Sequence, residues 1–471
     1  EALHLLAASA WLGSLLPLML CLRRLPASQA AALCQNFSPI GIGCVLLLAA
    51  SGLAQGMELV GTLPALVGTQ YGHIVLLKIT LFLVTLGFAA RNRLTLTDRL
   101  FDAGAETARR QLVHSIGAET LVGLAIVLAA GFLASTTPGA HEQPDWPFPW
   151  RPSLAVMTEP ELRREVVISA CLVGACLAVV AGTLVWRRGR AVAVLLALGV
   201  IAWQAPSFGL LVVDAYPTSF YASPTGFNAA AIVHGQALYA AQCADCHGTG
   251  GQGDGPASAG LRIHPADLTA GHLWDHPDGD LFWWIGHGMR DPEGGVAMPG
   301  FAAQLSEADR WDLIDYIRAN NAGTALRMES ARSLPPAMPV RCAGNSASQL
   351  SDLRGKVVLV ITAAASHVTG PPVIPPQDGF PVVALYLTGR RPNQGCVAET
   401  PDARAAFAIT AGLSPSAPSV PGYLVDPDGW LRAILPQDQV SKHPERLVAT
   451  IRTICDHLGG AAPSDEHAHH H

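Results

Sequence analysis

Long apolar stretches separated by short polar connections dominate the first half of the chain. Six of them approach the roughly 20 residues that a helix needs to cross a bilayer. They cover residues 2–22, 39–57, 72–90, 113–133, 166–186 and 191–213. The pattern predicts an α-helical transmembrane bundle of six helices over residues 1–213. The chain starts at Glu1, directly before an apolar stretch, so we expect an N-terminal region to be missing.

Arginines gather in alternate connections between these stretches. They are Arg23 and Arg24, then Arg91, Arg93, Arg99, Arg109 and Arg110, and finally Arg187, Arg188 and Arg190. Residues 61–71 contain no Lys or Arg. The connection after the fourth stretch is an exception to the alternation, because it contains Arg151, Arg163 and Arg164. Basic loops face the cytoplasm. The pattern therefore predicts a multi-pass protein of the bacterial inner membrane, with everything after residue 213 in the periplasm.

The second half of the chain changes character several times. A Pro/Ser/Tyr-rich linker (214–229) precedes a Gly- and His-rich region (230–323). A proline-rich linker (324–345) then leads to a segment that alternates strand and helix patterns (346–460), and a His-rich tail (461–471) ends the chain. We expect a multidomain protein: a membrane bundle, an all-α domain and an α/β domain.

The composition supports a membrane protein with soluble attachments, since 50% of residues are hydrophobic and only 14% are charged. A net charge of -6 gives no indication of a nucleic-acid partner. Half of the ten cysteines lie in apolar stretches and are interpreted as small buried hydrophobic residues: Cys21, Cys34, Cys44, Cys171 and Cys176.

Residues Cys243-Ala-Asp-Cys246-His247 form the signature of covalent haem attachment. The two thiols add across the haem vinyl groups, and the imidazole ligates iron from one side. The alternative is a redox dithiol beside an incidental histidine. A helical pattern before the signature and a glycine-rich loop after it favour the haem.

A second axial ligand is expected downstream, where a thioether or imidazole is able to wrap around the ring. Met298 in Ala-Met-Pro-Gly-Phe is the favoured candidate, with Met289 and His287 as competitors. An amphipathic helix is predicted to close the region, starting at Ser306 and continuing beyond Trp311.

These motifs resemble the class I cytochrome c family over residues 230–322. The resemblance implies a small all-helical fold, a covalent haem c bound through Cys243 and Cys246, iron ligation by His247 and Met298, and one-electron transfer. It implies an electron donor or acceptor in the periplasm without naming one.

The membrane segment has its own ordered cues. His4 and Trp11 lie in the first apolar stretch, Tyr71-Gly72-His73 opens the third, and Asn92-Arg93 closes it, before the aromatic and proline-rich residues 144–150. Together they resemble the copper resistance D (CopD) family from His4 to about residue 151. The resemblance implies copper uptake across the inner membrane, often beside a periplasmic copper-binding partner.

The predicted topology places His4, His73 and His141 near the outer ends of helices. Three imidazoles on one face are suited to Cu(II), and Met57 adds a softer ligand; alternatively, each histidine is an interfacial residue. Lys78 and Glu119 lie deeper, where ionisable groups are functional candidates. Lys78 either extends its ammonium group outward to the membrane surface or has a functional role. Glu119 either relays protons or a cation toward His114, or is hydrogen-bonded in a helix interface.

The last segment predicts a strand over 357–362, a strand–turn–strand over 421–430 and a helix over 444–458. It resembles the thioredoxin-like superfamily, in particular its Sco-like and peroxiredoxin-like branches, with Pro421 at the cis-proline position. The paired active-site cysteines are replaced by Ala-Ala-Ala-Ser-His-Val (363–368), which leaves only His367. We therefore expect a docking or vestigial domain.

Cysteines and histidines near the C-terminus leave two questions open. A structural disulfide is expected between two of Cys342, Cys396 and Cys455, with the pair undecided. The tail histidines either bind metal or belong to a tag or a disordered end; they are His467, His469, His470 and His471.

The combined hypothesis is an inner-membrane copper-handling protein whose tethered periplasmic cytochrome exchanges electrons with copper. The alternatives are a membrane-anchored respiratory electron carrier serving a terminal oxidase, or an oxidase assembly factor. We identify no hydrolytic or group-transfer motif.

Overall fold

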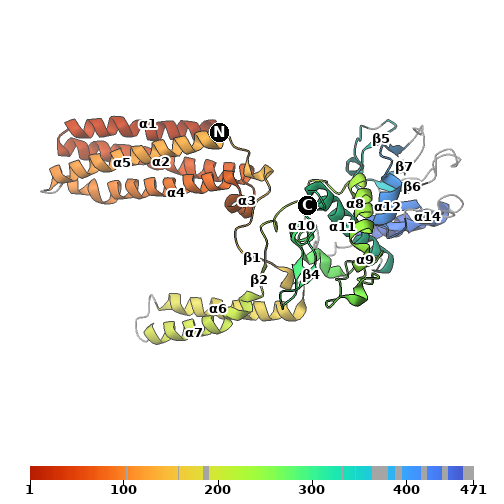
Figure 1. Cartoon of the computed structure of the whole chain (residues 1–471). Helices are drawn as coiled ribbons and strands as arrows, with labels where there is room; N and C mark the ends of the chain where they lie inside the picture. Colours follow the sequence, from red (N-terminus) through yellow and green to blue (C-terminus); the bar gives the residue numbers. More distant parts are fainter. Residues whose placement is uncertain are drawn as a thin grey trace. The chain divides into compact units, whose positions relative to one another are not determined.

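The structure is a computed structural model. It describes residues 1–101, 104–157, 159–183, 190–329, 332–344, 346–362, 380–387, 395–414, 422–436 and 444–459. The chain divides into two compact units, which are described separately (Figure 1). The first comprises Glu1–Arg151 with Asp214–Tyr221, and the second Pro152–Val213 with Ala222–His471.

Four long helices lie side by side in the first unit (Figure 1). They are α1 (Ala2–Arg24), α2 (Ala27–Leu59), α4 (Gln70–Arg91) and α5 (Ala105–Leu133). Short elements join them: α3 (Leu63–Gly68), the π-helix η1 (Asn92–Leu96) and the 3₁₀ helix η2 (Asp98–Phe101). The 3₁₀ helix η3 (Gly139–His141) follows α5. Helix α5 packs against both α1 and α4. Leucines from three elements, Leu15, Leu96 and Leu112, are at most 2% exposed and form the core of one end.

The prediction of six apolar spans is confirmed. Within the described residues, six helices are long and apolar enough to cross a membrane: residues 2–24, 28–59, 70–101, 105–133, 160–182 and 191–209. Many of their large apolar side chains point outward, as lipid-facing residues do; Leu121, for example, is 70% exposed.

The last two spans pair with each other in a helical hairpin. Helices α6 (Pro160–Gly182) and α7 (Arg190–Gly209) belong to the second unit and pack against each other. The hydroxyl of Ser169 donates to Gln204 Oε1 at 2.8 Å within this hairpin. The assignment of residues 1–213 to a single membrane domain stays a prediction.

The predicted linker 214–229 is anchored at both ends. In the first unit, the Trp146 amide donates to the Pro217 carbonyl at 2.8 Å, and the Trp146 ring lies 4.7 Å from that of Phe220. In the second unit, Asn228 caps the next helix, α8. The chain around this linker also forms β1 (Trp150–Pro152), η4 (Ala155–Met157) and β2 (Val212–Asp214).

The region predicted to be all-α is mostly helical, but it also contains a short antiparallel hairpin, β3 (Met289–Arg290) with β4 (Val296–Met298). Its other elements are α8 (Ala229–Gln242), α9 (Ala244–His247), η5 (Ser258–Gly260), η6 (Gly271–Asp275), α10 (Asp278–His287) and α11 (Glu307–Glu329). Helices α8 and α11 cross at Gly235, where a Cβ would overlap the Asp312 carbonyl. Helix α11 continues past the predicted boundary at residue 323.

The C-terminal region contains a six-stranded mixed sheet with strand order β10-β9-β6-β7-β8-β5. Pairs β6–β7 and β7–β8 are parallel, and the others antiparallel. The strands are β5 (Val340–Cys342), β6 (Val357–Ile361), β7 (Val382–Tyr386), β8 (Cys396–Ala398), β9 (Gly422–Val425) and β10 (Leu431–Leu435); η7 (Leu350–Leu353), α12 (Ala403–Thr410) and α14 (Pro444–Gly459) complete it. The thioredoxin-like assignment stays a prediction. Residues 363–368 with His367, Pro421 and the tail histidines lie outside the described residues.

The disulfide left open by the sequence joins Cys342 to Cys396. The two residues lie directly opposite in the antiparallel pair β5–β8. Cys455 is buried on α14 as a free thiol.

Helix α11 also contacts the C-terminal region through α12. A Cβ on Gly323 would overlap the Gly412 amide, so the backbones touch. Arg327 Nη1 donates to the Gly412 carbonyl at 2.7 Å, and the Ser333 hydroxyl donates to the Thr410 carbonyl at 3.0 Å.

Candidate functional site

The five residues of the haem-attachment signature form one helical turn at the end of α8. Helix α8 is capped by Asn228, whose side chain accepts from the Ala231 amide at 3.0 Å, and ends at Cys243. Helix α9 follows at once, with the His247 amide donating to the Cys243 carbonyl at 2.9 Å. Residues three apart share a face of a helix, so Cys243 and Cys246 present both thiols to one side. Both side chains are half-buried and unoxidised.

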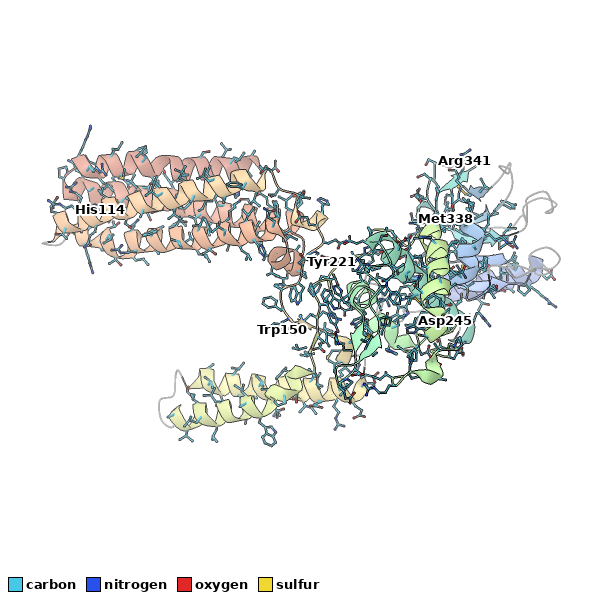
Figure 2. All side chains as sticks on the ribbon, in the orientation of Figure 1. His114, Trp150, Tyr221, Asp245, Met338 and Arg341 are labelled. Carbon is cyan, nitrogen blue, oxygen red and sulfur yellow. A yellow bond between two sulfur atoms is a disulfide. The ribbon has the colours of Figure 1, made fainter. Side chains whose placement is uncertain are left out.

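A tight glycine-rich loop wraps around this turn. Gly248 has a φ of 78°, a conformation that favours glycine. The loop then satisfies the carbonyls at the end of α9: the Gly253 amide donates to His247 at 2.8 Å and the Ala257 amide to Asp245 at 2.8 Å. Figure 2 labels Asp245 in this turn. The glycine spacing after the signature is therefore a packing requirement.

The imidazole of His247 is oriented for metal ligation. Its Nδ1 lies 3.0 Å from the Ala266 carbonyl, which is able only to accept. Burial lowers the pKa of His247, opposed by this hydrogen bond, so the neutral form is favoured. A neutral imidazole that donates from Nδ1 leaves its Nε2 lone pair for a metal, and ligating histidines usually have such a second partner. The site residues fit a covalent haem.

The thiol of Cys243 does not have the properties of a redox-active dithiol. Burial raises its pKa to about 12, with a smaller contribution from Cys246. A catalytic dithiol instead needs a cysteine whose pKa is lowered. A raised pKa is the opposite of this requirement, which agrees with the haem interpretation.

Met298 lies in the β3–β4 hairpin opposite Met289. Met298 is half-buried, whereas Met289 is 43% exposed. The hairpin is fixed to α10, because the Phe301 amide donates to the Ile285 carbonyl at 2.8 Å. The His287 ring stacks on Trp283 at 3.6 Å. The pairing of the two methionines was not predicted, because a two-residue strand leaves no alternating pattern in the sequence.

Helix α11 holds the loop that carries Ala266. Asn321 Nδ2 donates to the carbonyls of Leu268 and Ala270 at 2.9 and 3.0 Å. The buried Arg318 donates to the Leu273 carbonyl at 2.7 Å and forms an ion pair with Asp278. The closing helix therefore sets the position of the carbonyl that orients His247.

The predicted copper ligands have separate partners. His4 Nδ1 lies 2.8 Å from the Ser51 hydroxyl, and His73 Nε2 donates to the Val67 carbonyl at 2.8 Å. His141 ends η3, and Met57 is 66% exposed. Across the described ranges, no three His, Cys, Asp or Glu side chains form a group able to hold a metal ion. Copper binding by His4, His73 and His141 stays a prediction.

Glu119 is 3% exposed on α5 and accepts from Asn92 Nδ2 at 3.1 Å. This contact was not predicted, because Asn92 is 27 residues away on a π-helix and carries no local signal. His114 Nδ1 lies 2.7 Å from the Arg110 carbonyl. Lys78 on α4 is half-buried.

Together, the apolar helices and the haem-type site define a multi-pass membrane protein with a c-type cytochrome region. Comparison with known families agrees. Residues 31–133 match the family described as Copper resistance protein D (CopD), and residues 230–317 match Cytochrome C oxidase, cbb3-type, subunit III.

Two curated relatives resemble the membrane part. Inner membrane protein YebZ of Escherichia coli (strain K12) is 29% identical over 141 residues, covering 29% of this chain and 48% of the relative. Copper transport protein CutJ of Bacillus subtilis (strain 168) is 28% identical over 152 residues, covering 31% of this chain and 26% of the relative. The chain thus spans half or less of each relative's length.

Among solved structures, the Kuenenia stuttgartiensis reducing HAO-like protein complex Kustc0457/Kustc0458 is 25% identical, covering 26% of this chain and 59% of that chain with a TM-score of 0.18. This TM-score is too low to support an argument about the fold.

Proposed function

We propose that this protein handles copper at the bacterial inner membrane and exchanges electrons through a tethered periplasmic c-type cytochrome. The observation that supports this most directly is the haem-attachment turn, where the Ala266 carbonyl holds Nδ1 of His247 and leaves Nε2 for iron. The similarity of residues 31–133 to the CopD family supports a role for copper in the same chain.

The proposed roles of the haem-site residues follow from their chemistry. Cys243 and Cys246 would hold a haem through thioether bonds, and His247 and Met298 would ligate its iron. A bound haem supplies one-electron redox chemistry. Asn321 and Arg318 fix the loop that carries the Ala266 carbonyl, and thereby the orientation of the imidazole.

Copper is the proposed electron partner, because Cu(II) and Cu(I) differ by one electron. His4, His73 and His141 are the proposed entry ligands, since imidazole suits copper. A periplasmic copper-binding protein is the proposed source of the metal. The proposal includes copper uptake as the net activity.

A second candidate function is supported by the match of residues 230–317 to a cbb3-type oxidase subunit. In that case the membrane helices are an anchor, and the protein carries electrons to or from a terminal oxidase without moving copper.

A copper titration of the full-length purified protein, followed through the haem absorption bands, distinguishes the copper-handling function from the electron-carrier function. The first proposal expects saturable changes in these bands, and reoxidation of the reduced protein by Cu(II). The double variant His4→Ala/His73→Ala is expected to lower cellular copper accumulation and to leave oxidase-dependent respiration unchanged. Unchanged copper accumulation in this variant, together with haem bands that copper does not alter, overturns the first proposal in favour of the second.

A further inference from the structure

A buried polar group interrupts the apolar interior of the four-helix bundle. It consists of Glu119 on α5, Asn92 at the start of η1 and Ser115, one turn before Glu119 on the same face of α5. Glu119, Asn92 and Ser115 are 3%, 8% and 5% exposed, respectively. Within the described chain the packing beside them is apolar, with Leu96, Leu112 and Ile116 at most 3% exposed. An ionised carboxylate in such a place is costly unless it is compensated.

Two of the three side chains have buried atoms without a hydrogen-bond partner. Asn92 Nδ2 donates to Glu119 Oε2, but among the described residues Asn92 Oδ1 has no donor and Ser115 Oγ has no hydrogen-bond partner. Several other hydroxyls on the membrane helices donate to a backbone carbonyl of their own helix. Thr120, for example, donates to Ile116 at 2.8 Å and Thr80 to Leu76 at 2.8 Å. Ser115 thus departs from the ordinary pattern.

Asn92 Oδ1 can only accept a hydrogen bond. Because the Asn92 side chain lies against Glu119, the donor that it needs must be close to that carboxyl group. A proton on the carboxyl of Glu119 provides one. A carboxylic acid and a carboxamide that lie side by side form two hydrogen bonds, N–H to carboxyl oxygen and O–H to amide oxygen. The first of these is present between Asn92 and Glu119.

We propose that Glu119 and Asn92 form a proton-binding site inside the membrane domain. The carboxyl of Glu119 carries the proton and donates it to Asn92 Oδ1, which removes both the buried charge and the unpaired acceptor. Ser115 is the next polar group toward the end of α5 that carries Arg109, Arg110 and His114. Figure 2 places His114 at the end of the bundle opposite the N-terminus, and exchange with water takes place from that end.

The π-helix explains how Asn92 reaches this position. Its carbonyl accepts from the amide and the hydroxyl of Thr97, five residues on, at 2.9 and 2.8 Å. The wider turn fixes the Asn92 backbone, and π-helical turns are frequent at functional sites.

Other titratable groups on the packed elements have different surroundings. Several of these groups are exposed to solvent. Arg109 donates hydrogen bonds to the Glu106 carboxylate and to the Leu22 carbonyl. His4 lies against Ser51, and Lys78 is 14 residues from Asn92 along α4, about 21 Å at 1.5 Å per residue. Within the described residues, the exposed groups on α1, α2, α4, η1 and α5 are Cys21, Arg23, Arg24, Glu58, His73, Arg91, Arg93, Glu106, Arg110 and His114.

The direct test is infrared spectroscopy of the full-length protein in lipid nanodiscs at neutral pH. The proposal expects a carbonyl band of one protonated carboxylic acid per chain. Asp315 is another buried carboxyl, so the measurement uses protein carrying Asp315→Asn. Glu119→Gln, which retains an amide pair with Asn92, is expected to remove the band. The matched control Glu58→Gln, at an exposed position on α2, is expected to leave it unchanged.

Two further variants test the partners. Asn92→Leu is expected to shift the band to higher frequency because the acceptor is lost. Ser115→Ala is expected to keep the band and to slow its exchange with heavy water several-fold. The absence of a protonated-acid band from the Asp315→Asn protein overturns the proposal without any further variant. A band that survives Glu119→Gln also overturns it, as does a band that disappears when NaCl is added at constant pH, which indicates a bound cation instead.

Discussion

Met289 and Met298 lie opposite each other in the antiparallel β3–β4 hairpin, one 43% exposed and the other half-buried. Side chains of directly opposed residues project from the same face of a strand pair. The hairpin therefore presents two thioethers on one side, and the difference in burial favours Met298 as the iron ligand.

Met298→Leu is expected to remove the axial thioether and to lower the reduction potential by on the order of 0.1 V or more, within the ~0.8 V that axial ligands span. A redox titration measures the reduction potential, and the long-wavelength absorption band of methionine-ligated haem reports whether the thioether ligand is lost. Met289→Leu is the matched control and is expected to change neither. The reverse pattern assigns the ligand to Met289.

Gly235→Ala is expected to destabilise the cytochrome region by about 1–3 kcal/mol, since a Cβ there overlaps the Asp312 carbonyl and backbone must move. Denaturant unfolding of the full-length protein, followed by near-ultraviolet circular dichroism, measures the loss. Gly260→Ala has open space around its Cβ and serves as the control. Equal midpoints for both variants contradict the proposed close crossing of α8 and α11.

Asp315 predicts a pH-dependent stability. Burial raises its pKa to about 7, while a hydrogen bond from Thr225 acts in the opposite direction. The folded state thus holds the proton more tightly than the unfolded chain, where the pKa is about 3.9. Stability contributed by this group is complete below that value and falls as the pH rises to about 7, by about 4 kcal/mol at most.

Asp315→Asn is expected to flatten this dependence and to make the protein more stable than the wild type at pH values above about 7. Unfolding midpoints measured across the pH range test it, with Asp275→Asn, at an exposed position, as the control. A wild-type profile that stays flat through this range, or one that Asp315→Asn leaves unaltered, is inconsistent with the assignment.

Cys342→Ser is expected to destabilise the C-terminal region by about 4 kcal/mol, from the chain entropy of a loop whose ends are 54 residues apart. Thiol counting in denaturant, with and without reductant, checks the pair, and unfolding measures the loss. Cys455→Ala removes a free thiol and is expected to leave the oxidised pair intact. A disulfide that includes Cys455 would contradict the structure.

Much of the architecture was predictable from local sequence patterns. Six apolar stretches predict six spans because hydrophobic length is a local property. Cys243, Cys246 and His247 predict a haem-attachment turn because their spacing alone matches the chemistry. The C-terminal strand and helix patterns predicted a region of helices and sheet.

Relationships between distant residues were not predictable in the same way. The Cys342–Cys396 pair depends on β5 and β8 being sheet neighbours, and three cysteines allowed three pairings. The Asn92–Glu119 contact depends on a π-helical turn that no sequence pattern announced. The pairing of α6 with α7 depends on contacts between the two helices, whereas hydropathy reports only the length and composition of each.

Helix α11 belongs to two regions at once: its first turns cross α8, and its last turns contact Gly412 at the end of α12. Because one continuous helix packs in both regions, we expect the cytochrome region and the sheet region to unfold as one cooperative unit. Thermal protection by any ligand of the cytochrome region should therefore extend to the sheet, and an excised fragment ending at residue 323 should melt at a lower temperature than the same region in the whole chain.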